Sequence, residues 1–303
     1  MNETDYNEIN AVRELLAKRN RGDIPSIAEA RKADEEESST LPLPEGVTVE
    51  PVNDGGVIGE WVRAANVRPD AVMLYLHGGA YVFCSPATHR QMVAALSAAA
   101  GSPAFSLDYR LAPEATFPAA VEDAVQGYRW LLDRGFAPER IVIAGDSAGG
   151  GLAVATMLSL LDAGIVLPAA AICISPWADL TMTAKSYTMD GAALATRGRV
   201  ITYAEMYLKN VDTKHPLASP IFANLTGLPP MLIQVGSADP FYDDSINLAA
   251  RAKACGVETE LEVWEEMVHV WHYFHSMLGE GRRAITRIGE FVKAKIGEPS
   301  ARL

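Results

Sequence analysis

The sequence predicts an α/β protein in which a mostly parallel sheet carries helices on both faces. Five short, continuous apolar runs predict strands that are buried on both sides. They are Ala71–Leu76, Pro103–Leu107, Ile141–Ala144, Ala169–Ile174 and Met231–Val235. Segments of helical length lie between them, for example Phe117–Gly135 and Leu152–Ala163. Strands and helices that alternate in this way favour parallel strand pairing.

The remaining predicted strands differ from these runs. Thr48–Val52 and Ile58–Arg63 are expected to pair with each other. Near the end of the chain, Glu258–Val263 alternates glutamates with Thr259, Leu261 and Val263, and one polar face is typical of a strand near a sheet edge. Because an edge strand has unpaired backbone groups, this strand is a candidate surface for a homodimer.

The first 45 residues do not fit the sheet pattern. Apolar residues at helical spacing predict a first helix there, and they are Tyr6, Ile9, Val12, Leu15 and Leu16. A second, polar helix is expected over Ile27–Glu37, with the acidic run Asp34–Glu37 as a solvated face. Leu41-Pro-Leu-Pro-Glu-Gly46 then ends the helical pattern.

One connection is too long for an ordinary link between a strand and the next one. More than fifty residues separate Ile174 from Met231, and within them helical spacing predicts one more helix, carried by Val200, Ile201, Ala204, Tyr207 and Leu208. We expect residues 1–45 and residues 181–225 to form a cap over one end of the sheet. Residues 46–180 and 226–303 are then the two parts of the core.

Composition and charge limit the class of protein. The chain has 303 residues, of which 49% are hydrophobic and 21% charged, as in an ordinary globular protein. The formal net charge of −12 argues against a nucleic-acid binder. The polar, acidic start lacks a secretory pattern, and no apolar run is long enough to span a membrane, so we expect a cytoplasmic location. Cys84, Cys173 and Cys255 are expected to be reduced thiols.

The strongest local motif is Gly145-Asp-Ser147-Ala-Gly149, directly after a predicted strand and at the start of a predicted helix. A G-x-S-x-G turn at such a junction exposes the serine hydroxyl as a nucleophile, and the flanking residues must be small. A glycine-rich turn that only packs a helix on a strand is the alternative. A phosphate-binding loop is not, because neither of the usual glycine spacings is present.

A second glycine turn, His77-Gly78-Gly79-Ala80-Tyr81, follows the strand Ala71–Leu76. Acyl transfer builds negative charge on a carbonyl oxygen, which backbone N–H groups stabilise. We assign the N–H groups of Gly78, Gly79 and Ala148 as these oxyanion donors. His77 is expected to brace the turn and not to transfer protons.

A serine nucleophile needs a base, and the base needs an orienting acid. Asp239 follows the strand Met231–Val235 by a few residues, at the edge of the sheet where ligand sites lie. Asp243 is the alternative acid, although Asp243 and Asp244 are expected in the first turn of the next helix.

His269 is the candidate base because it comes after Asp239 and just past the last predicted strand. His272 and His275 follow at steps of three on an expected helix, where surface or packing roles are the simplest interpretation. An H-x-x-H-x-x-H metal site is a weak alternative, because helical metal pairs usually use a spacing of four. No metal is expected.

These motifs together resemble the bacterial hormone-sensitive-lipase-like esterases, also called family IV carboxylesterases, of the α/β-hydrolase superfamily. The resemblance covers residues 47–296 and includes Asp108-Tyr-Arg-Leu-Ala-Pro-Glu114 and Asp239-Pro. It implies the α/β-hydrolase fold, with an eight-stranded sheet and a helical cap made by the first residues and the insertion. It also implies a triad of Ser147, Asp239 and His269.

Two departures from the family pattern stand out. Family members usually have a third glycine where this chain has Ala80, and Gly-Phe where it has Val270-Trp271. The first change leaves the backbone donors in place, and the second is expected to narrow or reshape the pocket. The segment that begins at His269 is also similar to monoterpene epsilon-lactone hydrolases of this family.

The sequence therefore predicts a cofactor-free carboxylic-ester hydrolase whose partner is a small-molecule ester. An apolar pocket with Tyr81, Trp177 and Val270 as substrate contacts would favour short acyl esters or a cyclic lactone. Lactone hydrolysis, amide hydrolysis and a non-catalytic ligand-binding protein on the same fold are the alternatives. The last resembles plant gibberellin receptors, which lose the catalytic base, and His269 argues against it.

Overall fold

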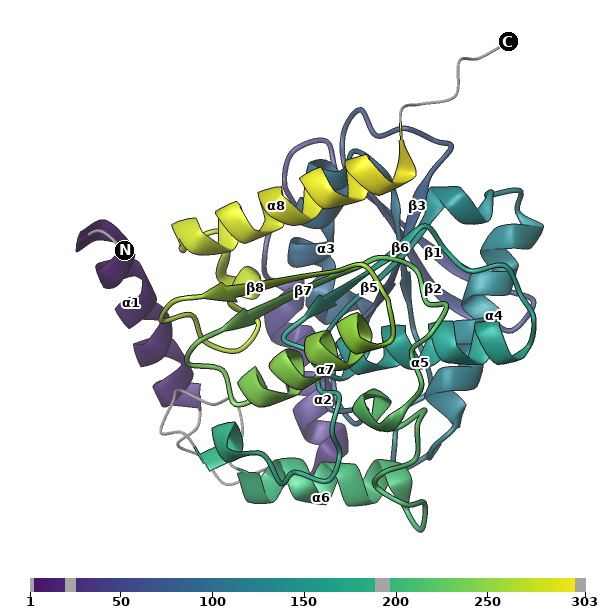
Figure 1. Cartoon of the computed structure of the whole chain (residues 1–303). Helices are drawn as coiled ribbons and strands as arrows, with labels where there is room; N and C mark the ends of the chain where they lie inside the picture. The colour runs from purple at the N-terminus through teal and green to yellow at the C-terminus, as the bar shows by residue number, and fades with distance from the viewer. Residues whose placement is uncertain (1–2, 20–25, 189–196, 298–303) are drawn as a thin grey trace.

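The structure is a computed structural model that describes residues 3–19, 26–188 and 197–297. Its centre is an eight-stranded sheet with the strand order β1-β2-β4-β3-β5-β6-β7-β8 (Figure 1). The strands are β1 Thr48–Asp54, β2 Val57–Arg63, β3 Val72–Leu76, β4 Ala104–Leu107, β5 Ile141–Asp146, β6 Ala170–Ile174, β7 Met231–Gly236 and β8 Thr259–Trp264. Each lies where the sequence predicts a strand, so the predicted α/β-hydrolase fold with eight strands is confirmed.

Strand direction agrees with the predicted scheme. β2 runs antiparallel to both β1 and β4, and the other five neighbouring pairs are parallel. Every residue of β3, β4, β5, β6 and β7 is buried, as continuous apolar runs predict. β8 is one of the two edge strands and is only partly buried, in agreement with its alternating sequence.

Helices cover both faces of the sheet. Those in the described residues are α1 Glu3–Arg19, α2 Ile27–Ser39, α3 Pro86–Ala100, α4 Ala119–Asp133, α5 Ala148–Asp162, α6 Arg197–Leu208, α7 Tyr242–Ala254 and α8 Gly279–Ile296. α3 and α8 pack on one face, whereas α4, α5 and α7 pack on the other (Figure 1). Side chains alternate along a strand, so Met73 and Tyr75 meet the first group while Leu74 and Leu76 meet the second.

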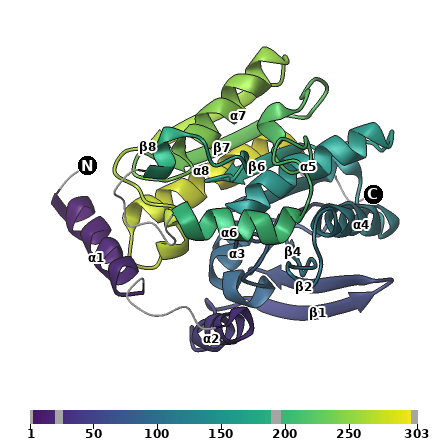
Figure 2. The same cartoon turned by 90° about the horizontal axis from the view of Figure 1, so that it is seen from below.

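Three helices, α1, α2 and α6, lie outside these two layers (Figure 2). α1 uses only part of its predicted apolar face. Ile9, Val12 and Leu16 are buried at i, i+3 and i+7, but Tyr6, three residues before Ile9, is 53% exposed and Leu15 is 40% exposed.

Two helix starts differ from the sequence expectation. α5 begins at Ala148 and not at Leu152, because the glycines after Ser147 form its first turn. Near the end of the chain, Trp271–Phe274 forms a short 3₁₀ turn, and α8 begins only at Gly279. His272 and His275 therefore do not share the long helix that the sequence predicts. No helix in the described residues is long and apolar enough to cross a membrane.

The contact between α3 and α8 generates a stability test. A Cβ placed on Gly289 of α8 would lie 2.3 Å from the carbonyl oxygen of Ala99 in α3, so the helices must separate to accept it. We expect Gly289→Ala to lower the free energy of unfolding by about 1–3 kcal/mol, measured by urea denaturation. Gly198→Ala in α6 is the matched control, because a Cβ there meets nothing within 4 Å. Equal stabilities for the two variants would contradict this packing.

Candidate active site

The carboxyl ends of the central strands bring the predicted site residues to one edge of the sheet. β3, β5, β6, β7 and β8 are parallel neighbours in register, so the segments after them leave the sheet on the same side. Ser147 follows β5 directly, Asp239 lies three residues after β7, and His269 lies five residues after β8. We call residues 78–84, which come after β3, the glycine loop, and residues 265–270 the histidine loop.

Ser147 sits on a tight turn in a strained conformation. Its φ and ψ angles are 52° and −120°, a region that residues with a side chain rarely adopt. Backbone approaches backbone directly after the serine: a Cβ on Gly149 would lie 1.9 Å from the Leu76 carbonyl oxygen, and one on Gly151 would lie 2.1 Å from that of Trp177. Larger residues would push the helix away from the sheet. Ser147 remains 8% exposed in this packing.

Asp239 and His269 form a buried hydrogen-bonded pair. His269 Nδ1–H donates to the carboxylate, with distances of 3.0 Å to Oδ1 and 3.1 Å to Oδ2. Asp239 is fully buried, and its Oδ1 also accepts the Phe241 N–H at 2.8 Å. The Phe241 ring lies 4.9 Å from the imidazole, centre to centre. These contacts fix the ring orientation and leave Nε2 of His269 as the nitrogen that faces away from the acid.

The serine and histidine segments are both attached to the end of β6. The Ser147 N–H donates to the Ile174 carbonyl at 2.9 Å, and the Val270 N–H donates to Ser175 Oγ at 3.2 Å. Ile174 and Ser175 therefore hold the backbone of Ser147 and of Val270, the residue after His269. Among the described residues, no hydrogen bond joins Ser147 Oγ to His269. Such contacts are often long in free enzymes and shorten when substrate binds.

The glycine loop corrects one sequence prediction. The Gly78 N–H donates to Asp146 Oδ1 at 3.0 Å, so this group is not available to an oxyanion, contrary to the predicted role of Gly78. Gly79 and Ala80, by contrast, have N–H groups without a hydrogen-bond acceptor among the described residues, as does Ala148 at the start of α5. Ala80 thus replaces Gly78 as a candidate donor. The sequence shows that the N–H exists but not which acceptor it meets.

Asp146 is a functional candidate that the sequence analysis missed. It lies beside Ser147, is 3% exposed, and also accepts hydrogen bonds from Tyr75 Oη at 2.6 Å and His89 Nε2 at 3.3 Å. Burial alone would raise the pKa of its carboxyl, but the attraction of His89 and the bonds from His89 and Tyr75 outweigh this and lower the pKa. A carboxylate within an otherwise apolar strand was the available signal, because buried charges need partners.

The predicted substrate contacts Tyr81, Trp177 and Val270 are all buried in this structure, and their role toward a substrate stays a prediction. Trp177 is fully buried, and its main role here is backbone support, because its N–H donates to the Ser147 carbonyl at 2.8 Å. Tyr81 is 1% exposed and stacks on Tyr207 of α6 at 3.9 Å. Val270 packs in the cluster formed with α3 and α8.

The other acidic candidates hold different partners. Asp243 and Asp244 lie in the first turn of α7, as predicted. Asp243 accepts the Ser186 N–H at 3.0 Å, and Asp244 accepts the N–H groups of Ala178 and Asp179, each at 2.9 Å, and the Tyr187 hydroxyl. Burial raises the pKa of Asp244 well above its ordinary value. Asp243 is therefore not the partner of His269.

The remaining histidines near the site are structural. His77 Nδ1–H donates to the Gly78 carbonyl at 2.7 Å, and its ring stacks on Tyr109, which agrees with the predicted bracing role. His272 Nε2–H donates to Gln234 Oε1 at 2.7 Å and so joins the histidine segment to β7. Burial lowers the pKa of both His77 and His272 to about 3. Within the described ranges, no group of three or more metal-binding side chains lies together.

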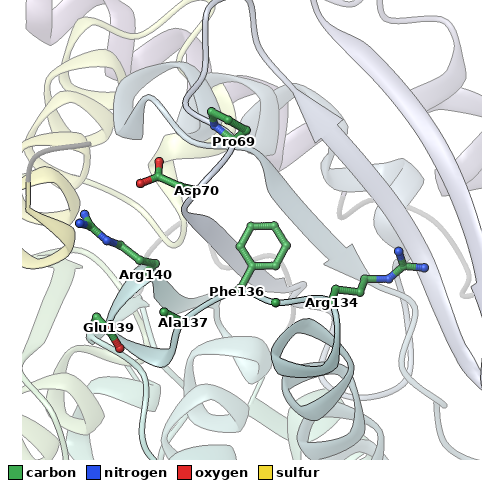
Figure 3. A pocket seen from close by; sticks show the side chains of 8 residues that line it. Pro69, Asp70, Arg134, Phe136, Ala137, Glu139 and Arg140 are labelled. Atoms are coloured by element: carbon green, nitrogen blue, oxygen red, sulfur yellow. The ribbon is translucent and has the colours of Figure 1, made fainter. Parts of the chain in front are cut away.

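A surface pocket lies at the opposite edge of the sheet (Figure 3). Its lining residues precede β3 or β5, whereas the candidate site comes after those strands. They are Pro69, Asp70, Arg134, Gly135, Phe136, Ala137, Glu139 and Arg140. Arg134 in this pocket is paired with Asp54 and lies over the Trp130 ring. Because its lining lies before the strands that the candidate site follows, the pocket is separate from that site.

Comparison with known proteins adds a family context. A family model described as alpha/beta hydrolase fold matches residues 73–273. An acetyl-hydrolase from Streptomyces hygroscopicus is 46% identical over 297 residues, which cover 96% of this chain and 98% of that protein.

Two solved structures are similar over nearly the whole chain. The crystal structure of EstE5 soaked with p-nitrophenyl butyrate has a TM-score of 0.90 at 48% identity and covers 95% of this chain and 98% of its own. An esterase from the bacterial hormone-sensitive lipase family has a TM-score of 0.92 at 45% identity, with 96% and 98% covered.

The buried neutral His272 predicts a specific dependence of stability on pH. An unfolded histidine binds a proton below about pH 6.5, whereas folded His272, with its pKa of about 3, stays neutral. The free energy of unfolding therefore falls as the pH is lowered from 6.5 toward 3, and this residue contributes about 2 kcal/mol of that loss by pH 5. We expect His272→Gln to reduce the difference in urea-unfolding free energy between pH 7 and pH 5 by this amount. An unchanged difference would show that His272 is not buried in its neutral form.

Proposed function

Because the chain belongs to the hormone-sensitive-lipase-like (family IV) carboxylesterases of the α/β-hydrolase superfamily, we propose that it hydrolyses acetyl and other short-acyl esters through an acyl-enzyme on Ser147. Carboxylic-ester hydrolysis follows from the family. The finer assignment rests on one observation above all: the buried Asp239–His269 pair lies at the same sheet edge as the strained Ser147 turn.

The proposed reaction begins with attack of Ser147 Oγ on the ester carbonyl carbon. Nε2 of His269 takes the hydroxyl proton, and Asp239 stabilises the resulting imidazolium through Nδ1–H. When the tetrahedral intermediate collapses, the carbon–oxygen bond to the alcohol breaks and His269 returns the proton to the leaving alcohol. A water molecule, deprotonated by the same histidine, then attacks the acyl carbon. The bond to Ser147 Oγ breaks, His269 returns the proton to Oγ, and the acid leaves. This chemistry requires no metal or cofactor.

Three backbone N–H groups are proposed to stabilise the negative oxygen of each tetrahedral intermediate. Those of Gly79, Ala80 and Ala148 are suited to this because no acceptor in the described residues occupies them. Donors that are fixed before the reaction need no reorganisation as charge develops, and each is worth about 10²–10³-fold in rate. Ala80 serves as well as glycine because only its backbone takes part.

The acyl preference is inferred from two sources. The relative from Streptomyces hygroscopicus is named an acetyl-hydrolase, and EstE5 crystals were soaked with a butyrate ester. Residues 1–45 and 181–225 are proposed as the cap; within these ranges, residues 1–2, 20–25 and 189–196 lie outside the described residues. Cytoplasmic location and a homodimer through β8 remain predictions.

A nucleophile test is direct. Ser147→Ala should lower kcat for p-nitrophenyl acetate by about 10⁴-fold or more, because no other group can form the acyl-enzyme. Ser159→Ala, a partly buried serine of the same helix, is the matched control and should leave kcat unchanged. A fluorophosphonate probe should label the wild type and the control variant but not Ser147→Ala. Wild-type turnover in Ser147→Ala would refute the assignment.

A substrate panel tests the acyl preference. We expect kcat/KM to be highest for acetyl and butyryl p-nitrophenyl esters and to fall by more than about 10-fold for the decanoyl ester, as a preference for short acyl groups requires. An ε-lactone and an acetyl anilide, followed in a pH-stat, should be slower than the acetyl ester. A lactone faster than every linear ester would replace the proposal with lactone hydrolysis, and a faster anilide with amide hydrolysis.

A further inference from the structure

We propose that Arg31 of α2 is a positioning residue that holds the glycine loop, and with it the N–H groups of Gly79 and Ala80, in the geometry that hydrolysis needs. The inference rests on the proposed function of these two N–H groups. It concerns a residue of the amino-terminal segment that lies in none of the motifs that predicted the site. The observation that carries it is a set of hydrogen bonds from one guanidinium to two main-chain segments beside the site.

Arg31 uses four N–H donors on the core of the protein. Nε–H donates to the Val82 carbonyl at 2.7 Å, and one Nη2–H donates to the Ala112 carbonyl at 2.6 Å. The other two bonds form a bidentate pair with Glu114, at 3.0 and 2.9 Å. The Arg31 side chain is 24% exposed and that of Glu114 is 64% exposed. The two carbonyl contacts are therefore the protected part of this set.

The glycine loop needs external support because its backbone is strained. Gly79, Ala80 and Tyr81 have φ angles of 105°, 55° and 62°, and a run of positive φ angles is unfavourable for alanine and tyrosine. Such a conformation persists only where the surroundings impose it. Within the loop, the N–H groups of Val82 and Phe83 both donate to the Gly79 carbonyl, which closes the turn but does not tie it to a neighbouring segment.

Arg31 also joins the glycine loop to Ala112, a second residue that binds the backbone of the loop. The Ala112 N–H donates to the Tyr81 carbonyl at 2.8 Å, while the Ala112 carbonyl accepts from Arg31. One guanidinium thus holds the Val82 carbonyl and the residue that binds the preceding carbonyl of the loop. Tyr207 of α6 stacks on the Tyr81 ring from the cap side. Without Arg31, the loop keeps this stacking and the bonds of Gly78 and Tyr81, but the Val82 carbonyl loses its donor and Ala112 loses its second contact.

The predicted effect is on the rate of the chemical steps. Both acylation and deacylation pass through an oxyanion, so displaced donors lower kcat while ground-state binding changes little. A displacement of about 1 Å is enough to reduce a rate by about 10²-fold. We expect Arg31→Ala to lower kcat for p-nitrophenyl acetate by about 10–100-fold per active site titrated with the fluorophosphonate, with KM within about 3-fold. Arg31→Lys, which can reach one carbonyl, should be intermediate.

Two variants separate this role from simple stabilisation. Glu114→Gln removes the exposed ion pair and leaves both carbonyl contacts of Arg31, so kcat should stay within about 2-fold of wild type. Arg68→Ala is the matched control: Arg68 binds Asp70 through two bonds and the Gly297 carbonyl through a third, but it lies just before β3, at the opposite edge of the sheet. It should lower the melting temperature without changing kcat per titrated site.

A second measurement is independent of turnover. Hydrogen exchange followed by mass spectrometry should be faster in peptides covering residues 78–84 of Arg31→Ala than in wild type or Arg68→Ala. Unchanged exchange there, or kcat per site within about 2-fold of wild type, would overturn the positioning role. If the wild type does not hydrolyse the acetyl ester, the proposed function fails, but the exchange measurement still decides whether Arg31 holds the loop.

Discussion

The close approach of α5 to β3 is the constraint on which the rest of the site depends. The first turn of α5 touches the end of β3 through main-chain atoms, because Gly149 has no side chain to keep them apart. This contact forces Ser147 into its strained turn and places the amino end of α5 beside the glycine loop. The nucleophile and the proposed oxyanion donors are therefore brought together by backbone packing, before any polar side chain takes part.

A buried carboxylate then fixes the relation between the two turns. Asp146 precedes the serine and binds the Gly78 N–H, so this bond links the serine turn to the first residue of the glycine loop. The cost of burying this charge is offset by donors from Tyr75 and His89. The same bond consumes one N–H of the loop, which leaves the next two N–H groups for an anionic oxygen. The Asp146 side chain thus determines which of the N–H groups of Gly78, Gly79 and Ala80 remain free for the oxygen.

The sequence predicts the elements well because their signals are local. Continuous apolar runs identify β3 to β7, and the alternating glutamates identify the edge strand β8. The pairing of Asp239 with His269 was also predictable, because both residues come after strands that a parallel sheet brings together. The bond from the Gly78 N–H to Asp146 and the inward packing of Trp177 were not predictable, since each depends on contacts with residues that are distant in the sequence. Arg31 carries no local signal at all, because its role appears only where α2 meets the glycine loop.

The packing of α1 against the histidine loop and Trp271 joins two segments that are far apart in the sequence. Ile9, Val12 and Leu16 find their partners among Met267, Val268 and Trp271, and the nearby ion pair between Arg13 and Glu266 spans 253 positions. During synthesis, the apolar stripe of α1 cannot pack against these partners until β8 and the histidine loop have been made. An apolar surface that lacks its partner is prone to aggregation, so the stripe of α1 depends on residues that are synthesised much later.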